Sequence, residues 1–353
     1  MIIRHLRRSS ILAAAAVLTG CASEPPVQFD VALPPDVVDA RGRFVEIYCA
    51  VLEARAATLP DYRPCAAALS NVANAPRGSG QPVDLGFSQR GLVAAVVPGI
   101  GYACFAQWLE APGTARSHVR QFGFDMVPID VDALSGTATN ARQIRDAVMA
   151  QPMEPGEPRL VLIGYSKGTP DILEAVVAYE EIRDRIAAIV SVAGVVGGSP
   201  LANDAKQEQA DLLRHWPKAE CEPGDGQGVE SLRPDVRKTW LAANALPHAV
   251  RLYSVVTLPD PGLISRAVRS GYKKLAKIDS RNDSQMIYSD QFVPDSTLLG
   301  FLNADHWAVV VPINRAHPAI AKSLVNHNDY PREALLEAVL RFVEEDLAVG
   351  ARP

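Results

Sequence analysis

Long apolar runs and concentrated charge are both scarce in this chain of 353 residues. Outside the N-terminal region no run of 18 or more apolar residues occurs, which excludes an internal membrane-spanning helix. The formal net charge is only −5, and the basic residues form no cluster of the kind that nucleic-acid binders use. The sequence contains no internal repeat or low-complexity tract. We therefore expect a globular protein without a nucleic-acid partner.

Cysteine is also sparse, and the spacing of the five cysteines fits no zinc-binding pattern, so we expect no metal site. The first of them, Cys21, ends a distinctive N-terminal segment. Three arginines within the first eight residues precede a short apolar stretch at residues 11–18, and the segment closes with Leu-Thr-Gly-Cys. A basic start, a short apolar core and small residues at the end predict a secretory signal peptide.

The Leu-Thr-Gly-Cys ending resembles the lipobox of bacterial lipoproteins, in which the cysteine is acylated and becomes the mature N-terminus. Residue 22 is Ala rather than Asp, which by the sorting rule of such lipoproteins favours the outer membrane. The resemblance implies a signal peptide over residues 1–20 and a lipid anchor at Cys21. It places the protein in a bacterial cell envelope, on the outer membrane and facing the periplasm. A plain signal peptide with a chance cysteine is the alternative.

Export would put the four remaining cysteines in an oxidising compartment, where an even number predicts disulfides. Cys49 and Cys65 are close in the sequence and belong to the same N-terminal segment. We therefore predict the pairs Cys49–Cys65 and Cys104–Cys221.

Apolar runs and helical patterns alternate along most of the chain. Strand-like runs cover residues 91–97, 122–129, 159–163, 186–193 and 250–256. Helical patterns cover residues 45–57, 104–120, 140–150, 170–182 and 331–347. Strands separated by helices imply crossover connections, and so a mostly parallel central sheet with helices on both faces.

The domain organisation follows from the stretches that break this alternation. Residues 21–40 are Pro-rich and are predicted to be a tether, followed by one α/β domain over residues 41–353. Residues 197–248 are far longer than an ordinary connection, so we expect an inserted helical cap there. A second insertion covers residues 259–280.

The pentapeptide Gly164-Tyr165-Ser166-Lys167-Gly168 follows a strand-like run and precedes a helix start. In this context G-x-S-x-G indicates a sharp strand-to-helix turn that presents the serine hydroxyl as a nucleophile. A serine needs an adjacent base, which in this arrangement lies further along the chain. His306 follows an apolar, strand-like run and is the candidate base. The later histidines at positions 215, 248, 317 and 327 are interpreted as surface or structural residues.

The orienting carboxylate should lie between the serine and the histidine. Asp283 lies in a polar turn, Arg-Asn-Asp-Ser, and is the first candidate, while Asp290 is the alternative. Asp305 adjoins His306 and is too constrained to orient it.

Together these residues resemble a lipase or esterase of the α/β-hydrolase superfamily, and bacterial lipases in particular. In such lipases an Asn-Asp-Gly loop carries the acid, and here Asn282-Asp283-Ser284 matches it except for the serine. The histidine follows about two dozen positions later, and here the gap is 23 (306 − 283). The family's His-Gly turn corresponds to Pro98-Gly99, so the resemblance implies an oxyanion hole formed by the backbone N–H groups of Ile100 and Lys167.

The expected function is therefore hydrolysis of a small-molecule or lipid ester with an apolar acyl group, with Ser166, His306 and Asp283 as the catalytic residues and no cofactor. The alternatives are a binding lipoprotein that keeps the fold without catalysis, and a peptidase or acyltransferase with the same triad.

Overall fold

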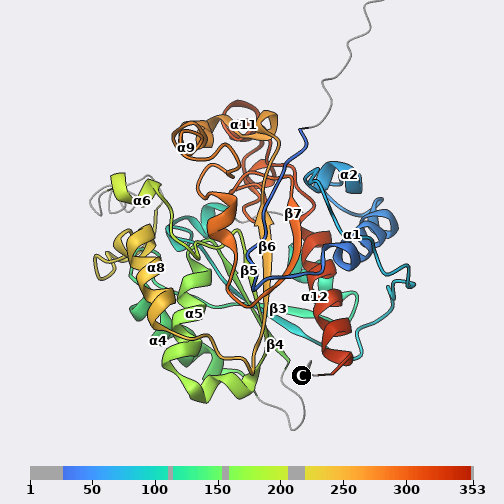
Figure 1. Ribbon diagram of the computed structural model, residues 1–353, viewed down its shortest axis with the longest axis horizontal. Helices are drawn as coiled ribbons and strands as arrows, with labels where there is room; N and C mark the ends of the chain where they lie inside the picture. Colours follow the sequence, from blue (N-terminus) through green and yellow to red (C-terminus); the bar gives the residue numbers. More distant parts are fainter. Residues whose placement is uncertain (1–26, 110–113, 153–158, 206–218, 351–353) are drawn as a thin grey trace, which may run out of the picture.

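The computed structural model describes residues 27–109, 114–152, 159–205 and 219–350, which build one parallel β-sheet between two layers of helices (Figure 1). The sheet has seven strands in the order β1-β7-β6-β5-β4-β2-β3, and every pair of neighbours is parallel. The strands are β1 Val38–Asp39, β2 Val93–Val97, β3 Asp125–Pro128, β4 Leu160–Tyr165, β5 Ile186–Val192, β6 Arg251–Thr257 and β7 Thr297–Leu302. The predicted parallel α/β architecture is confirmed.

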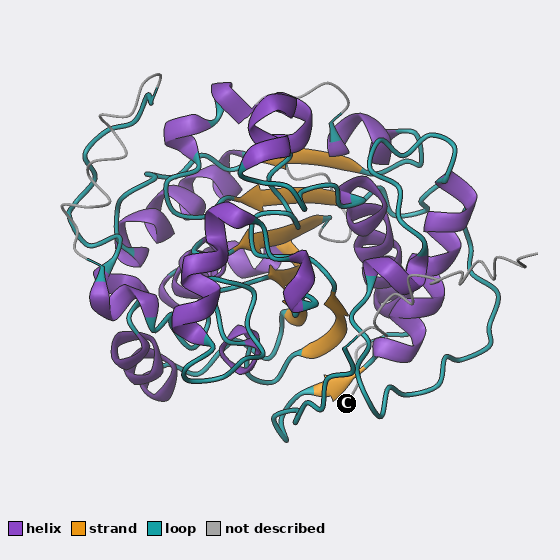
Figure 2. Cartoon of the chain, turned by 90° about the horizontal axis from the view of Figure 1, so that it is seen from above, coloured by secondary structure: helices purple, strands orange, loops and turns teal. Residues whose placement is uncertain are grey.

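Helices cover both faces of this sheet. In the described residues they are α1 Arg41–Arg55, α2 Cys65–Ala68, α3 Ala115–Arg120, α4 Thr137–Ala150, α5 Gly168–Ala178, α6 Leu201–Asp204, α8 Pro234–Ala243, α9 Arg269–Leu275, α10 Ile313–Ala316, α11 Pro318–Ser323 and α12 Arg332–Ala348. Figure 1 shows α4, α5 and α8 on one side of the strands and α1 and α12 on the other. Seen from above, the strands lie between the two helical layers (Figure 2).

The central strands are apolar because the helix layers bury both of their faces. Every residue of β4 and of β5 is buried, and their side chains divide between the two hydrophobic clusters of the core. Such strands have the continuous apolar runs that the sequence shows, rather than an alternating pattern. Of the described helices, none is long and apolar enough to cross a membrane.

The two ends of the described chain pack together. Strand β1 pairs with β7, and α1 packs along α12, where Arg43 and Glu345 form an ion pair of 2.7 Å. Phe29 and Val37 lie inside the predicted tether, yet both are buried. From residue 27 onward this segment therefore lies against the domain, because its few apolar residues find partners beside β7 and β6.

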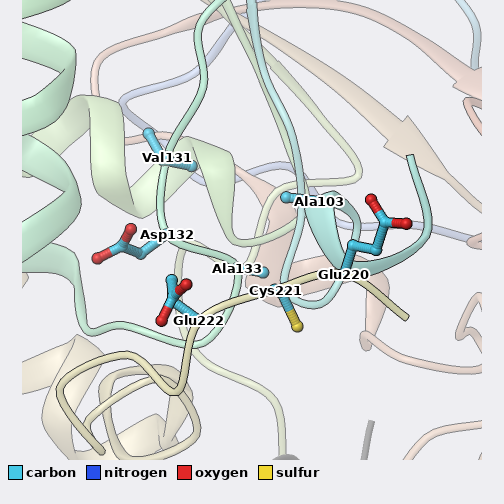
Figure 3. A pocket seen from close by; sticks show the side chains of 7 residues that line it. All are labelled: Ala103, Val131, Asp132, Ala133, Glu220, Cys221 and Glu222. Atoms are coloured by element: carbon cyan, nitrogen blue, oxygen red, sulfur yellow. The ribbon is translucent and has the colours of Figure 1, made fainter. Parts of the chain in front are cut away.

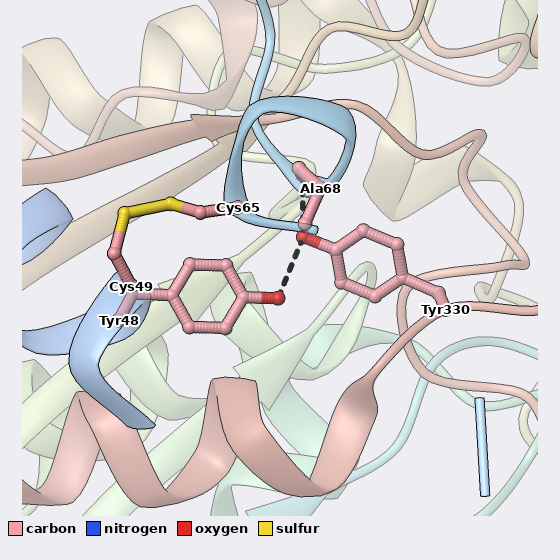
Figure 4. Close-up of a disulfide and its surroundings, with 5 residues drawn as sticks. All are labelled: Tyr48, Cys49, Cys65, Ala68 and Tyr330. Carbon is pink, nitrogen blue, oxygen red and sulfur yellow. Dashed lines mark hydrogen bonds between the residues drawn. A yellow bond between two sulfur atoms is a disulfide. The ribbon is translucent and has the colours of Figure 1, made fainter. Parts of the chain in front are cut away.

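Both predicted disulfides are present, Cys49–Cys65 and Cys104–Cys221. The first joins α1 to the start of α2 (Figure 4). Beside it the Tyr48 hydroxyl donates to the Tyr330 hydroxyl at 3.2 Å, and Tyr330 donates to the Ala68 carbonyl at 2.9 Å. These contacts connect the N-terminal segment to the loop that precedes α12.

The helix expected over residues 104–120 is not continuous. The structure has two short 3₁₀ turns, Ala103–Phe105 and Gln107–Leu109, and a separate α3. Thr114 caps α3 by accepting a hydrogen bond of 3.2 Å from the Ser117 N–H, which marks a new helix start. The apolar residues that suggested one long helix instead line a cavity, described below.

Candidate active site

Ser166 lies at the sharp turn between β4 and α5, with a φ of 55° that is unusual for a residue other than glycine. The glycines on either side allow this turn. A Cβ at Gly164 would lie 2.6 Å from the Thr169 backbone, and one at Gly168 would lie 2.2 Å from the Val97 carbonyl oxygen. The small residues of the pentapeptide are therefore required by close backbone contacts, and the strained serine is held out at the carboxyl end of the sheet.

The structure brings together Ser166, His306 and Asp283, which are far apart in the sequence. The His306 Nε2 lies 2.9 Å from the Ser166 Oγ, and the His306 Nδ1 lies 2.7 Å from the Asp283 Oδ2. All three side chains are buried. Because Asp283 accepts the Nδ1 proton, the Nε2 lone pair is directed at the serine hydroxyl.

Further hydrogen bonds fix the acid and the base. Asp283 accepts from the Thr257 hydroxyl and from the N–H groups of Gln285, at 2.9 Å, and Met286, at 2.6 Å. The Tyr165 hydroxyl donates to the His306 carbonyl oxygen at 2.7 Å. Neither Thr257 nor Tyr165 was among the site residues predicted from the sequence. Tyr165 lies inside the pentapeptide and Thr257 directly follows the strand predicted over residues 250–256, but neither position alone indicates a polar partner.

The alternative carboxylates point elsewhere. Asp290 lies 3.5 Å from the Lys238 Nζ, and Asp305 accepts from the N–H groups of Ser265, Trp307 and Ala308. Burial raises the pKa of both carboxyls. In the described residues neither contacts the imidazole of His306, so the geometry favours Asp283 over Asp290 as its partner.

The other histidines that the structure describes do not join this group. His317 stacks on Trp108 with ring centroids 3.8 Å apart, His248 is exposed, and partial burial lowers the pKa of His327. His215 and Cys21 lie outside the described residues.

The loop after β2 lies directly against the nucleophile. A Cβ at Gly99 would lie 3.0 Å from the Ser166 Cβ and 3.4 Å from its Oγ, so this close approach depends on glycine. The Gly101 N–H donates to the Ala133 carbonyl at 2.9 Å and fixes the loop. Within the described part of the chain, the N–H groups of Ile100 and Lys167 donate to no backbone carbonyl. Both amides are therefore available to a bound oxygen.

A cavity of about 640 Å³ opens onto Ser166 and His306. Most of its walls are apolar, with contributions from the loop after β2, from residues 195–205 and 229–232, and from the segment after His306. Among the lining side chains are Phe105, Trp108, Leu201, Leu232, Trp307 and Val311. The stretch that was expected to form a cap thus supplies part of the cavity wall, although its status as a separate cap stays a prediction. An apolar cavity with few polar groups suits the organic part of a small molecule.

The Lys167 side chain turns away from the cavity into a buried ion pair. Its Nζ lies 2.7 Å and 2.8 Å from the two oxygens of Asp171, and both side chains are almost fully buried. The Asn140 amide donates to the same carboxylate at 2.7 Å. Burial raises the pKa of Asp171, although the nearby ammonium of Lys167 opposes that shift.

A second hollow, of about 430 Å³, lies beside the Cys104–Cys221 disulfide (Figure 3). Its lining is small or acidic: Ala103, Val131, Asp132, Ala133, Glu220, Cys221 and Glu222. It holds no nucleophile paired with a base. Among the described residues, no group of three or more His, Cys, Asp or Glu side chains is arranged to hold a metal ion.

A parallel sheet in this order, with a serine at the turn after a central strand and a histidine beyond the last strand, defines the α/β-hydrolase class. The chain is 36% identical to a metagenomic carboxyl esterase, MGS0156, over 90% of this chain and 96% of that one, with a TM-score of 0.82. It therefore belongs to the same carboxyl esterase family of α/β-hydrolases. The predicted resemblance to the α/β-hydrolase superfamily is confirmed.

More distant structures share the fold. The mature lipase BlEst2 of Bacillus licheniformis is 19% identical, with 69% of this chain and 95% of that chain covered and a TM-score of 0.53. The Staphylococcus hyicus lipase is 11% identical, with 77% and 100% covered and a TM-score of 0.53. No family model and no curated sequence matches the chain.

Proposed function

We propose that this protein is a serine-dependent hydrolase of carboxylic esters with an apolar acyl group. The observation that carries the proposal is the continuous hydrogen-bonded series Ser166–His306–Asp283, which ends in a mostly apolar cavity. The family relationship to a carboxyl esterase supports the same reaction class.

In the proposed mechanism the Ser166 Oγ attacks the ester carbonyl carbon while the His306 Nε2 accepts the hydroxyl proton. The imidazolium is stabilised by Asp283, and its proton then passes to the departing alcohol oxygen. A water molecule, activated by the same nitrogen, hydrolyses the acyl-enzyme and restores the serine. The protein atoms that exchange or stabilise this proton are already neighbours, with the His306 Nε2 2.9 Å from the Ser166 Oγ and the His306 Nδ1 2.7 Å from the Asp283 Oδ2.

The negative charge that develops on the carbonyl oxygen needs fixed donors. We assign the N–H groups of Ile100 and Lys167 to this oxyanion hole, because the Gly99 loop touches the serine and Lys167 follows it directly. The family's histidine in this turn is Pro98 here, but the donor is a backbone amide of the next-but-one residue. The substitution therefore leaves the donor in place.

The proposal extends to the location of the enzyme. The N-terminal signal pattern and the Leu-Thr-Gly-Cys motif support export, acylation of Cys21 and attachment to the outer membrane, facing the periplasm. Two disulfides support an oxidising compartment, because such bonds are rare in the bacterial cytosol.

The test is hydrolysis of aryl esters of increasing acyl length by the wild type and by Ser166→Ala, His306→Ala and the double variant. We expect each single variant to lose nearly all activity and the double variant to lose little more, because the two residues act as one unit. Thermal unfolding measured in parallel shows whether each variant is folded. Full activity in folded Ser166→Ala would contradict the proposal, and a preference for the shortest acyl group would contradict the apolar substrate.

A further inference from the structure

The cavity that contains Ser166 opens at one identifiable place. Of the described residues that line it, only Ala267 and Leu324 are exposed, and Leu324 is 53% exposed. The Ala267 N–H donates to the Leu324 carbonyl at 2.8 Å, so the two residues lie side by side. They come from the 3₁₀ turn Arg266–Val268 and from the end of α11. The mouth of the cavity therefore lies between these two elements.

Six exposed cations lie on or next to the elements that carry Ala267 and Leu324, and we call them the basic rim. They are Arg266, Arg269, Lys273, Lys274, Lys277 and Lys322. Arg266 lies in the same turn as Ala267, and Arg269 begins α9. Lys273 and Lys274 lie on α9 and Lys277 just after it, and Lys322 lies two residues before Leu324. Figure 1 shows α9 and α11 at the same end of the molecule.

Among the described residues, the cations of the basic rim are not paired with acids. Residues 261–278 contain no Asp or Glu, and within the described part of the chain no cation of the rim forms an ion pair. Four of the chain's eight lysines belong to the rim, although the protein as a whole carries a net charge of −5. The positive charge is thus concentrated at the cavity mouth.

Apolar side chains project among these cations. Ile278 is 66% exposed directly after Lys277, and Leu324 is exposed beside Lys322. Exposed apolar residues within a ring of lysines and arginines match the chemistry of an anionic lipid surface, where the cations meet the headgroups and the apolar side chains enter the interface.

The start of the described chain lies on the same side. The Val27 N–H donates to Asp260, at 3.4 Å, and Asp260 directly precedes the segment that carries most of the rim. Cys21 is six residues (27 − 21) before Val27, and six residues span at most about 20 Å. An anchor at Cys21 would hold the basic rim close to the bilayer.

We propose that the basic rim docks the cavity mouth onto an anionic lipid bilayer, so that an ester substrate enters the cavity from the membrane. Docking itself goes beyond the proposed ester hydrolysis and requires neither Ser166 nor the lipid anchor. Only the delivery of substrate rests on the proposed function.

The test uses a chain that starts at residue 22, which lacks the signal segment and Cys21 but keeps every residue that the structure describes. Binding is measured by co-sedimentation with phosphatidylcholine vesicles, with and without phosphatidylglycerol. The test variant replaces Lys273, Lys274 and Lys277 by Gln. A matched control replaces three exposed arginines on other elements, Arg77, Arg120 and Arg142, by Gln.

We expect the wild type and the control to bind vesicles that contain phosphatidylglycerol. The test variant should bind about a hundredfold more weakly, since each of the three lysines near the surface contributes about 1 kcal/mol, or about fivefold in affinity. Added salt should weaken the binding. Equal binding by the test variant and the wild type would overturn the proposal. So would a concentration-dependent dimer that the lysine substitutions abolish, because the rim would then bind a second copy.

Hydrolysis of a water-soluble aryl ester separates this proposal from the proposed function. The three lysines do not line the cavity, so the test variant should turn over the soluble ester at the wild-type rate but hydrolyse a vesicle-borne ester more slowly. If no variant hydrolyses either ester, the proposed function fails, whereas the vesicle-binding result still decides the docking.

Discussion

A carboxylate that accepts four hydrogen bonds has little freedom to turn, and Asp283 is such a carboxylate. Its donors are the Thr257 hydroxyl, the His306 Nδ1–H and the N–H groups of Gln285 and Met286. The first donor comes from the end of β6 and the last two from the loop that carries Asp283. The acid is therefore positioned by the sheet as well as by its own turn, before any substrate arrives.

Asp283→Asn should lower kcat for an aryl ester on the order of a thousandfold or more. An amide can donate to Nδ1 and so stabilise the tautomer that places the proton on Nε2, where the serine hydroxyl can no longer be deprotonated. Asp290→Asn is the matched control and should cost much less, because Asp290 lies beside Lys238 instead. The reverse order of the two losses would assign the orienting role to Asp290.

Lys167→Met should destabilise the protein by about 3–5 kcal/mol at neutral pH, because it leaves the Asp171 charge buried without its cation. Burial raises the pKa of Asp171, so the native state keeps this proton at a higher pH than the unfolded state does. The free energy of unfolding of Lys167→Met should then fall as the pH rises from the pKa of Asp171 in the unfolded state to its higher pKa in the native state. The loss measured by urea unfolding should therefore be smaller at acidic pH than at alkaline pH.

The double variant Lys167→Met/Asp171→Asn is the control for this pH dependence, because it carries no buried charge at either position. It should be more stable than Lys167→Met and should lack the added dependence on pH. An equal loss in the single variant at all pH values would show that Asp171 is not the group responsible.

At the scale of elements, the Cys104–Cys221 disulfide joins two walls of the catalytic cavity. Cys104 belongs to the loop that carries Ile100 and Phe105, and Cys221 precedes Val229 and Leu232. A hydrogen bond of 3.0 Å from the Glu220 N–H to the Cys104 carbonyl reinforces the connection. The Cys49–Cys65 disulfide lies between α1 and α2, and neither cysteine lines the cavity.

Replacing Cys104 and Cys221 together by Ser should therefore lower kcat by about tenfold or more, since loss of one oxyanion donor costs about a hundredfold or more and the loop would be only loosened. Replacing Cys49 and Cys65 by Ser should leave kcat unchanged while lowering the free energy of unfolding by about 3 kcal/mol. Kinetics and denaturant unfolding of both double variants would distinguish these effects. Unchanged kcat in both double variants would show that the Cys104–Cys221 disulfide has no influence on the site.

The sequence predicted the elements that are apolar throughout and missed those defined by tertiary contacts. Residues 186–193 were recognisable as a strand because burial on both faces leaves no polar position, and the structure has β5 at Ile186–Val192. Strand β1 has only two residues and exists because β7 offers an edge, so no local pattern marks it. In residues 104–120 the spacing of the apolar side chains predicted one helix, but several of these side chains face the cavity from two separate 3₁₀ turns.

The same distinction applies to the site. The serine and histidine positions carry local signals, a small-residue turn and a loop after a strand, and the structure places these side chains together. Thr257 and Tyr165 act through partners far along the chain, so their contacts appear only in the fold. The basic rim was also missed, because its five sequence-local cations are spread over residues 266–277 and Lys322 joins them only by packing.

At the scale of the whole molecule, Cys21→Ser should abolish the incorporation of radiolabelled palmitate into the expressed protein, because acylation requires that thiol. The variant should also leave the membrane fraction after a high-salt wash that weakens the contact of the basic rim. Ala22→Asp is a useful second variant, since it should keep the label while changing the membrane to which the protein is sorted. Equal labelling of Cys21→Ser would contradict the proposed lipoprotein.

The meeting of the two chain ends has a consequence for how the protein is made. Strand β1 needs β7, and α1 needs α12, yet both partners lie in the last 60 or so residues, from Thr297 to Ala348. While the ribosome is still producing the chain, β1 lacks its strand partner and α1 lacks the helix that covers it. The sheet and the α1–α12 layer can be completed only after nearly the whole polypeptide has been synthesised, and such late completion suits the proposed export, which requires a chain that has not yet folded.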